Sequence, residues 1–213
     1  KMIAITLENQ IEGDGAFYKK NKININLNNN KMTIQELALQ GKHNIYNSMA
    51  AAIATRILDV KNDIIRQSML DFQNIEHRLE YVLTVHGIDF INDSKASNVN
   101  ASWYALESMT KPVIWIVGGV DKGNDYNEIK ELVKEKVKVI VCLGESSKKI
   151  QKYFKKIVNK IETASSMQEA VRASYSLADK GDVVLLSPTC ASFDLFDNFE
   201  QRGQEFKNQV RKL

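Results

Sequence analysis

A short polar segment near the middle of the chain contains side chains that are suited to binding an anion. Residues 90–98 have the sequence FINDSKASN, in which an apolar run gives way to an acid, a lysine, two hydroxyls and an amide: Asp93, Ser94, Lys95, Ser97 and Asn98. A helical pattern begins directly afterwards. Lysine supplies positive charge, while serine hydroxyls and the backbone amides of a helix N-terminus supply hydrogen-bond donors. The segment therefore predicts an anion site at a strand-to-helix corner.

Two later segments place similar side chains directly after apolar strands. Residues 118–125, GGVDKGND, follow the strand pattern VIWIV and contain Lys122, and residues 187–194, SPTCASFD, follow VVLL and contain Ser192. In an open parallel sheet, ligands bind outside the carboxyl ends of the strands. If these strands are parallel, the three segments emerge at one edge and form one crevice.

Each segment also has a simpler structural interpretation. Ser97 or Asn98 is a good N-cap for the following helix. Asp93 and Lys95 suit an exposed ion pair of little energetic weight. The glycine pair suits a tight turn, and SPTCAS suits a helix start. The occurrence of all three segments at equivalent positions favours the binding site.

Two asparagines and a histidine–arginine pair are further polar candidates. Asn44 and Asn47 lie three residues apart in an alanine-rich helical pattern and share a face, although asparagine is a poor helix former. Their amides could pair with an adenine edge; the alternative is capping by Asn44 and solvent exposure of Asn47. His77 beside Arg78 is suited to phosphate contact and equally to a structural role.

The hydrophobic patterning predicts an α/β fold. Residues 1–39 show β-alternation, with a polar-tipped hairpin in NKININLNNN, and two helices follow within 41–72. From about residue 80, strands and helices alternate, which predicts a mostly parallel sheet flanked by helices. The family resemblance described below implies that this sheet is Rossmann-like. A boundary is expected near QNIEHRLEY, which gives a first part, residues 1–74, and a second domain, residues 75–213. The family resemblance described below implies that the first part is an incomplete domain.

Two helices have predicted buried faces. The first face contains apolar residues at helical spacing: Ile45, Met49, Ala52, Ile53 and Ile57. The last helix is expected to extend to the end of the chain, with a face formed by Phe196, Phe199, Phe206, Val210 and Leu213.

Composition excludes several classes of protein. The net charge of +3 is too balanced to indicate nucleic-acid binding, and the lysine-rich stretch 148–160 is best explained as a solvated helix face. No apolar run has the length of a membrane span, and two cysteines far apart suit a reduced, cytoplasmic compartment. Histidines and cysteines are too few and badly spaced for zinc. Neither a phosphate loop nor a G-x-G-x-x-G motif is present.

Several long motifs, taken in order, resemble the Mur ligases, and within that family the members that add D-glutamate. The motifs are GKHNIYNSMAAAIA, EHRLEYV, FINDSKASN, VGGVDKGNDY and LLSPTCASFDLFDNFEQRGQEFKNQV. The resemblance implies that residues 1–74 are the last part of the central ATPase domain and that residues 75–213 are the C-terminal, amino-acid-binding domain. The phosphate loop and magnesium ligands would lie upstream, and the abrupt start in strand alternation suits a chain entered partway.

The resemblance also implies an activity. Family members are ATP-dependent carboxylate–amine ligases of peptidoglycan synthesis, which supports cell-wall growth, cell shape and division. The expected partners are small molecules, namely ATP, Mg²⁺, D-glutamate and UDP-N-acetylmuramoyl-L-alanine, used by a cytoplasmic monomer. This chain alone is expected to be inactive. The alternatives are a sibling ligase that adds another amino acid, a folylpolyglutamate synthase-like enzyme, and a non-catalytic α/β module that binds a nucleotide or a small acid.

The nucleotide roles that the resemblance implies fall on five residues. Asn44 and Asn47 would face the adenine of ATP, and Asp93 would hold the ribose. Arg78 would reach the phosphates and Lys95 would lie near them, which makes these two cations the expected catalytic residues.

The amino-acid site implied by the resemblance also has five members. Ser97 and Lys122 would bind the α-carboxylate of D-glutamate, while Ser192, Phe193 and Phe199 would enclose its side-chain carboxylate. Two positions depart from the family pattern: Ser97 stands where threonine is frequent, and Phe193 occupies a variable position. Both changes retain hydroxyl or apolar character.

Overall fold

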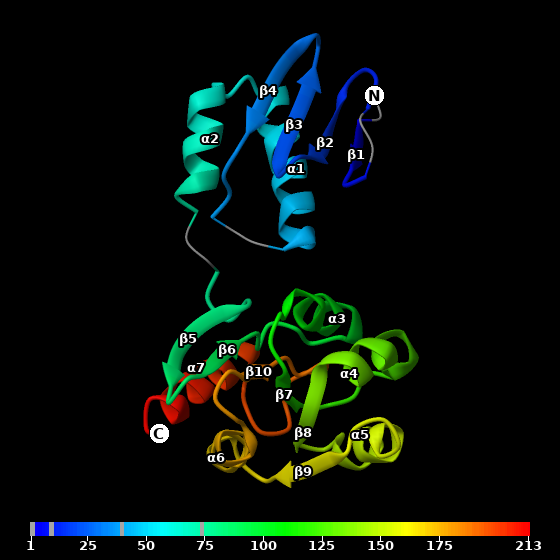
Figure 1. Ribbon diagram of the computed structural model, residues 1–213, viewed down its shortest axis with the longest axis vertical. Coiled ribbons are helices and arrows are strands. Elements are labelled where there is room, and N and C mark those ends of the chain that lie inside the picture. Colours follow the sequence, from blue (N-terminus) through cyan, green and yellow to red (C-terminus); the bar gives the residue numbers. More distant parts are fainter. Residues whose placement is uncertain (1–2, 9–10, 39–40, 73–74) are drawn as a thin grey trace. The chain divides into compact units, whose positions relative to one another are not determined.

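The structure is a computed structural model of the chain and describes residues 3–8, 11–38, 41–72 and 75–213 (Figure 1). The chain divides into two units, Lys1–Asn74 and Ile75–Leu213, each with its own core. Residues 1–2 of the predicted first strand and residues 73–74 of the predicted boundary lie outside the described residues.

The first unit combines a four-stranded sheet with two helices. The strands are β1 (Ala4–Thr6), β2 (Gly15–Lys19), β3 (Lys22–Leu27) and β4 (Asn30–Ile34), in that order across the sheet. Strand β1 pairs parallel to β2, and the other neighbours are antiparallel. Asn28 and Asn29 turn the β3–β4 hairpin with φ of 50° and 62°, a left-handed conformation that asparagine tolerates better than most residues. The predicted polar-tipped hairpin is confirmed.

Helices α1 (Lys42–Ile57) and α2 (Asn62–Leu70) complete this unit. Met49, Ala52 and Ile53 of α1 are buried in the core, as their spacing predicts. The prediction for Ile57 is wrong, because the helix ends there and its side chain is 56% exposed.

The second unit contains a six-stranded sheet in the order β5-β6-β10-β7-β8-β9. The strands are β5 (Glu80–Val85), β6 (Ile88–Asn92), β7 (Val113–Val117), β8 (Val137–Leu143), β9 (Lys160–Ala164) and β10 (Val183–Leu186). Only β5 is antiparallel, joined to β6 by a turn at His86 and Gly87, whose φ values are 49° and 84°. The expected α/β fold with a mostly parallel sheet is confirmed.

Helices cover both faces of this sheet (Figure 1). On one face lie α3 (Val99–Ser108), η1 (Tyr126–Ile129, a 3₁₀ turn), α4 (Lys130–Lys136) and α5 (Ser147–Phe154); on the other lie α6 (Met167–Leu177) and α7 (Phe199–Val210). Strand β7 is buried throughout and divides its side chains between the two cores. Trp115 faces α5, and Ile114 faces α6 and α7. Such two-sided burial explains the continuous apolar run of this strand.

The last helix is shorter than predicted. Asn198 caps it, with its side-chain oxygen accepting from the amide of Gln201, so α7 begins at Phe199 and Phe196 lies before it. Phe206 and Val210 are buried as predicted. The prediction for Leu213 is wrong, because the helix ends at Val210 and the Leu213 side chain is 37% exposed.

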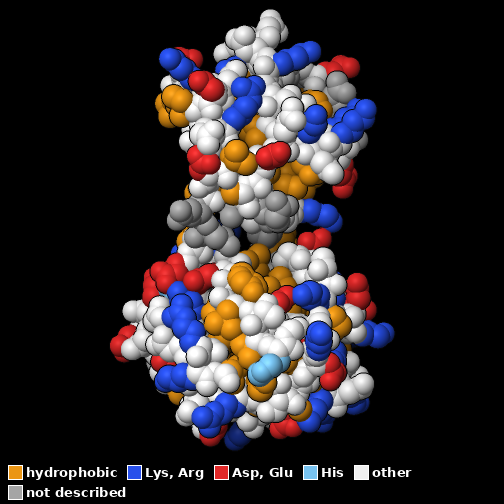
Figure 2. All heavy atoms as spheres, turned by 60° about the vertical axis from the view of Figure 1, so that its left-hand side comes forward, with side chains coloured by type: hydrophobic (Ala, Val, Ile, Leu, Met, Phe, Trp, Pro, Cys, Tyr) orange, Lys and Arg blue, Asp and Glu red, His pale blue; other side chains and the backbone are white. Residues whose placement is uncertain are grey.

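The surface carries both charges. On the face drawn in Figure 2, Lys and Arg side chains are interspersed with Asp and Glu, as the net charge of +3 suggests. Among the described helices, none combines the length and the apolar character needed to cross a membrane.

Candidate active site

Three polar loops meet at the carboxyl edge of the second sheet. They follow β6, β10 and β7, which are neighbours in the sheet and run parallel. The loops after β7 and β10 also pair directly, because the amide of Val120 donates to the carbonyl of Ala191 at 2.9 Å and the reverse bond is 3.2 Å. The expectation that these segments share one edge is confirmed.

The glycine pair at the end of β7 permits close packing of these loops. Gly118 and Gly119 have φ of 132° and 130°. A Cβ on Gly118 would lie 2.0 Å from the carbonyl oxygen of Leu143, and a Cβ on Gly119 would lie 2.1 Å from that of Ala191. Any side chain here would push the neighbouring loops apart. The pair therefore does more than form a tight turn.

The corner after β6 separates its polar side chains. Asn98 caps α3 by accepting from the amide of Ala101 at 2.8 Å, which confirms the capping interpretation for Asn98, and Ser97 is half-buried. Asp93 is only 4% exposed, whereas Lys95 is exposed and its ammonium lies 4.6 Å from the centre of the Phe199 ring. The interpretation of Asp93 and Lys95 as an exposed ion pair is wrong, because the Asp93 side chain is buried and only the Lys95 side chain is exposed.

Asp93 connects the corner to two other segments. Its Oδ1 accepts from the amide of Leu79 at 3.1 Å, and its Oδ2 accepts from the hydroxyl of Ser187 at 2.9 Å. Burial raises the pKa of this carboxyl to about 7, even though both hydrogen bonds and the charge of Arg78 favour ionisation. Asp93 therefore has a structural task in this unit, and its contact with ribose stays a prediction.

The turn that precedes β5 carries Arg78, which is half-buried. Its neighbours His77 and Leu79 have positive φ of 64° and 45°. The carbonyl of His77 accepts from the amide of Lys95 at 3.0 Å, so the turn is bonded directly to the corner after β6. The structure thus holds the backbones of Arg78 and Lys95 close to each other, and the two predicted catalytic cations belong to adjoining segments.

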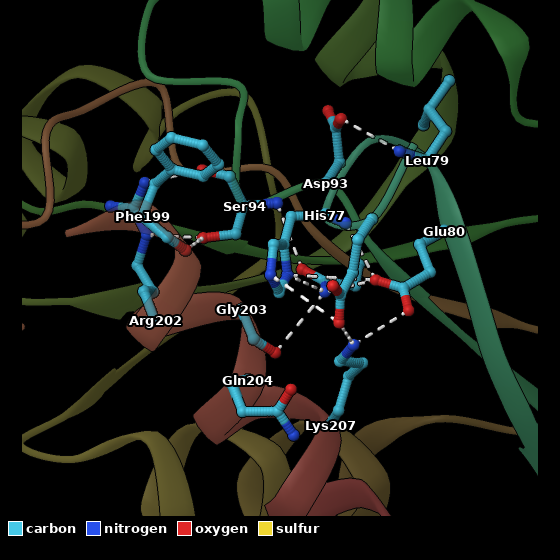
Figure 3. A network of polar contacts seen from close by, with 12 residues as sticks. His77, Leu79, Glu80, Asp93, Ser94, Phe199, Arg202, Gly203, Gln204 and Lys207 are labelled. Atoms are coloured by element: carbon cyan, nitrogen blue, oxygen red, sulfur yellow. Dashed lines mark hydrogen bonds and ion pairs between the residues drawn. The ribbon is translucent and has the colours of Figure 1, made fainter. Parts of the chain in front are cut away.

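His77 itself is a structural residue, as one of the two interpretations predicts. Its ring is 5% exposed, and the amide nitrogen of Asn92 lies 2.9 Å from its Nδ1 (Figure 3). Because that amide donates, Nδ1 accepts and a neutral ring carries its proton on Nε2. Burial lowers the pKa of His77, which keeps the ring neutral near physiological pH.

The residues predicted to bind the amino acid lie on the converging loops and at the start of α7. Lys122 is exposed on the loop after β7. Asp121 stabilises this loop, because its Oδ1 accepts hydrogen bonds from the backbone amides of Gly123 and Asn124. Ser192 is 3% exposed, while Phe193 beside it is 72% exposed. Phe199, the first residue of α7, packs under Lys95 and joins that helix to the corner.

The two asparagines belong to the other unit. Asn44 lies inside α1, whose N-cap is Gly41, so the interpretation of Asn44 as the cap is wrong. Asn47 is exposed, which agrees with the simpler interpretation that its amide faces solvent. Asn47 also lines a groove of 330 Å³ between α1 and α2, together with Ala51 and Phe72.

Three important residues on α7 escaped the sequence analysis. Arg202 is 2% exposed and donates to Ser94 Oγ at 3.0 Å, the Ser94 carbonyl at 2.8 Å and the Cys190 carbonyl at 3.1 Å. Gly203 lies against the His77 ring, and Lys207 is 5% exposed. The one signal in the sequence was the glycine in the interior of an otherwise regular helix, where it is unfavourable.

A possible cation site adjoins the turn. Within the described parts of the chain, Glu76, His77 and Glu80 bring three potential ligand atoms within 4.8 Å of one another. The ammonium of Lys207 contacts both carboxylates, at 3.0 Å in the case of Glu80. The chain therefore supplies its own cation here, and these residues do not suit Mg²⁺.

Fold and site together define an open α/β domain with three polar loops at the carboxyl edge of its sheet. Residues 77–190 match the family described as Mur ligase, glutamate ligase domain. The chain belongs to the Mur ligase family. It is 52% identical over 213 residues to the UDP-N-acetylmuramoylalanine–D-glutamate ligase of Christiangramia forsetii, covering 99% of this chain and 48% of that protein. Identity to the corresponding Porphyromonas gingivalis ligase is 48%, with coverage of 100% and 48%.

Solved structures support the fold. A pseudomurein peptide ligase type C from Methanothermus fervidus aligns with a TM-score of 0.70 at 18% identity, covering 95% of this chain and 42% of that one. UDP-N-acetylmuramate–alanine ligase from Thermotoga maritima aligns with a TM-score of 0.63 at 11% identity, covering 91% and 44%. The chain spans about half the length of the curated relatives it matches.

Proposed function

We propose that this chain is the C-terminal half of a cytoplasmic, monomeric, ATP-dependent ligase that joins D-glutamate to UDP-N-acetylmuramoyl-L-alanine in peptidoglycan precursor synthesis. The observation that carries the proposal is the convergence of the three polar loops on one sheet edge. Relatives about half identical to this chain along its whole length are named as D-glutamate ligases, which supports the choice of amino acid.

The amino-acid site in this proposal combines a positively charged side chain with hydroxyl groups that donate hydrogen bonds. Lys122 and Ser97 bind the α-carboxylate of D-glutamate, and Ser192 receives the side-chain carboxylate between Phe193 and Phe199. A dicarboxylate needs a cation and several hydrogen-bond donors, which the converging loops offer. The exposure of Phe193, 72%, leaves its ring free to cover a ligand.

The proposed nucleotide contacts fall on five residues. Arg78 and Lys95 face the phosphates, Asp93 holds the ribose, and Asn44 and Asn47 face the adenine. The apolar groove beside Asn47 supports the adenine assignment, since it offers a flat base both apolar contact and an amide. In this proposal the Mg²⁺ ligands are not among the residues named here, and the cluster beside Lys207 does not suit Mg²⁺ because it already contains a cation.

The proposed chemistry is amide formation through an acyl phosphate. ATP phosphorylates the carboxylate of UDP-N-acetylmuramoyl-L-alanine, and the amine of D-glutamate then displaces phosphate. The residues of this chain act by positioning and by charge. Lys122 and Ser97 hold the amine-bearing carbon near the acyl carbon, and Lys95 offsets negative charge that develops at the reacting phosphate.

Titration of the 213-residue chain with D-glutamate, followed by NMR, tests the amino-acid site. We expect the amide signals of Ser97, Lys122 and Ser192 to shift at millimolar D-glutamate and to shift less with L-glutamate. Replacement of Lys122 by methionine should weaken binding by about tenfold, because it removes a charge-assisted hydrogen bond.

The matched control is Lys134→Met, which removes an exposed lysine from α4 and should leave the titration unchanged. Equal responses to the two enantiomers, or shifts confined to other parts of the chain, would contradict the assignment.

A further inference from the structure

Lys207 is a buried cation with two acidic partners. Its side chain on α7 is 6% exposed, and its ammonium contacts Glu76 as well as Glu80, the latter at 3.0 Å (Figure 3). Burial alone would lower the pKa of Lys207, but the hydrogen bonds to the two glutamates outweigh it and raise the pKa. Lys207 therefore stays charged, and its partners lie at the two ends of the turn that carries Arg78, with Glu76 before it and Glu80 as the first residue of β5.

Gly203, one helical turn before Lys207, forms a notch for the same turn. A Cβ at this position would lie 2.2 Å from Nδ1 of His77, so only glycine lets the imidazole approach the helix so closely. The His77 ring also meets the Phe199 ring edge-on, at 6.2 Å between centres. Helix α7 thus contacts the turn through three of its residues.

The backbone of this turn is strained. His77 and Leu79, on either side of Arg78, are non-glycine residues with left-handed φ of 64° and 45°. Such conformations persist only where the surroundings enforce them. The enforcing contacts are visible here: Glu80 accepts from the amide of His77 at 2.9 Å, and Asp93 accepts from the amide of Leu79 at 3.1 Å.

We infer that Lys207 is a positioning residue that fixes this turn and thereby aims Arg78 at the nucleotide phosphates. The inference rests on the proposed function for its ligand and on the contacts of residues 76–80 for its mechanism. With Lys207 present, Glu80 is held between the ammonium and the amide of His77, and the turn keeps its strained form. Without the ammonium, two carboxylates repel each other beside His77, and the turn relaxes.

The functional test uses steady-state kinetics of the full-length ligase. We expect Lys207→Met to raise the KM for ATP by on the order of tenfold to a hundredfold, because a small displacement of a positioned group is costly. The value of kcat should also fall, because the displaced Arg78 is one of the two predicted catalytic cations, whereas the KM for D-glutamate should change little. Lys207→Arg should restore most of both losses. The matched control is Lys212→Met, an exposed lysine in the same terminal segment.

A second measurement on the 213-residue chain is independent of ligation. The groups that act on the His77 ring are Glu76, Glu80, Glu200 and Lys207. Because the charge of Lys207 lowers the pKa of His77, Lys207→Met should raise that pKa, as measured from the ring signals by NMR. If Lys207→Met does not fold, Glu76→Gln provides the test, since Glu76 is exposed. The charge of Glu76 raises the pKa of His77, so its removal should lower that pKa, while the KM for ATP should rise as in Lys207→Met but by less.

The outcomes separate the two proposals. An unchanged His77 pKa together with an unchanged KM for ATP would overturn the role of Lys207. A raised His77 pKa with an unchanged KM for ATP would also overturn it, because the turn would then not serve the nucleotide. A raised His77 pKa in Lys207→Met, in a protein whose wild type ligates nothing, would support the role of Lys207 in fixing the turn and remove the proposed function.

Discussion

Replacement of Arg202 by alanine is expected to lower the free energy of unfolding of the second unit by about 4–5 kcal/mol. The hydrogen-bond acceptors of this buried guanidinium are all neutral oxygens, two on Ser94 and one on Cys190. Its removal leaves two buried carbonyls without that donor, at a cost of about 1–3 kcal/mol each, and opens a cavity. Burial lowers the pKa of Arg202 to about 10, so the wild-type side chain is charged at neutral pH.

Urea denaturation followed by tryptophan fluorescence measures this loss. Both tryptophans, Trp103 and Trp115, lie in the second unit and report on its unfolding. Arg202→Lys should give an intermediate loss, because it keeps the charge and loses the planar fork. The control Arg211→Ala, at an exposed position just after α7, should stay within about 0.5 kcal/mol of wild type. A loss below about 1 kcal/mol for Arg202→Ala would show that the loops after β6 and β10 do not depend on this residue.

Replacement of Asp93 by asparagine is expected to change how stability depends on pH. The folded pKa of Asp93 is raised to about 7, whereas an unfolded aspartate titrates near 3.9. Between these values the folded protein binds more protons than the unfolded chain, so wild type loses stability as pH rises from about 4 to about 7. Asparagine does not titrate. The stability of the variant relative to wild type should therefore increase by about 4 kcal/mol across this interval.

The same denaturation experiment, repeated from pH 4 to pH 8, checks the sign. Asp89→Asn is the matched control, because Asp89 lies on the same strand and its hydrogen bond to Lys111 lowers its pKa. Because the folded and unfolded pKa values of Asp89 both lie at or below about 4, the difference between that variant and wild type should stay nearly constant from about pH 5 to pH 8. A difference between Asp93→Asn and wild type that is constant over the whole pH range would show that the Asp93 carboxyl is not held in a buried, neutral form.

Local sequence pattern was sufficient to predict the fold class of the second unit and the shared edge of its polar loops, although not the order of its strands. The continuous apolar runs of β7 and β10 identify buried parallel strands, and the polar segments after them identify one edge of the sheet. Asn98 was a candidate cap from its position alone. These features depend on a residue and its near neighbours in sequence, which is why they were accessible.

The supporting interactions depend on contacts between distant segments. Asp93 bonds to Ser187, 94 residues away, and Lys207 bonds to Glu76, 131 residues away. Nothing in the sequence distinguishes Lys207 from the exposed lysines near it. Likewise, nothing in the sequence indicates that Asp93 is buried and not paired with Lys95. Burial of a charged residue is decided by the tertiary packing around it.

The most direct test of the central claim is ligation by the full-length protein that contains this chain. Purified enzyme is given ATP, Mg²⁺, UDP-N-acetylmuramoyl-L-alanine and one amino acid at a time, and the nucleotide product is identified by mass spectrometry. We expect one new amide with D-glutamate, formed only when ATP is present, and no product from the 213-residue chain alone. Preferential use of another amino acid, ligation without ATP, or ligation by the chain alone would contradict it.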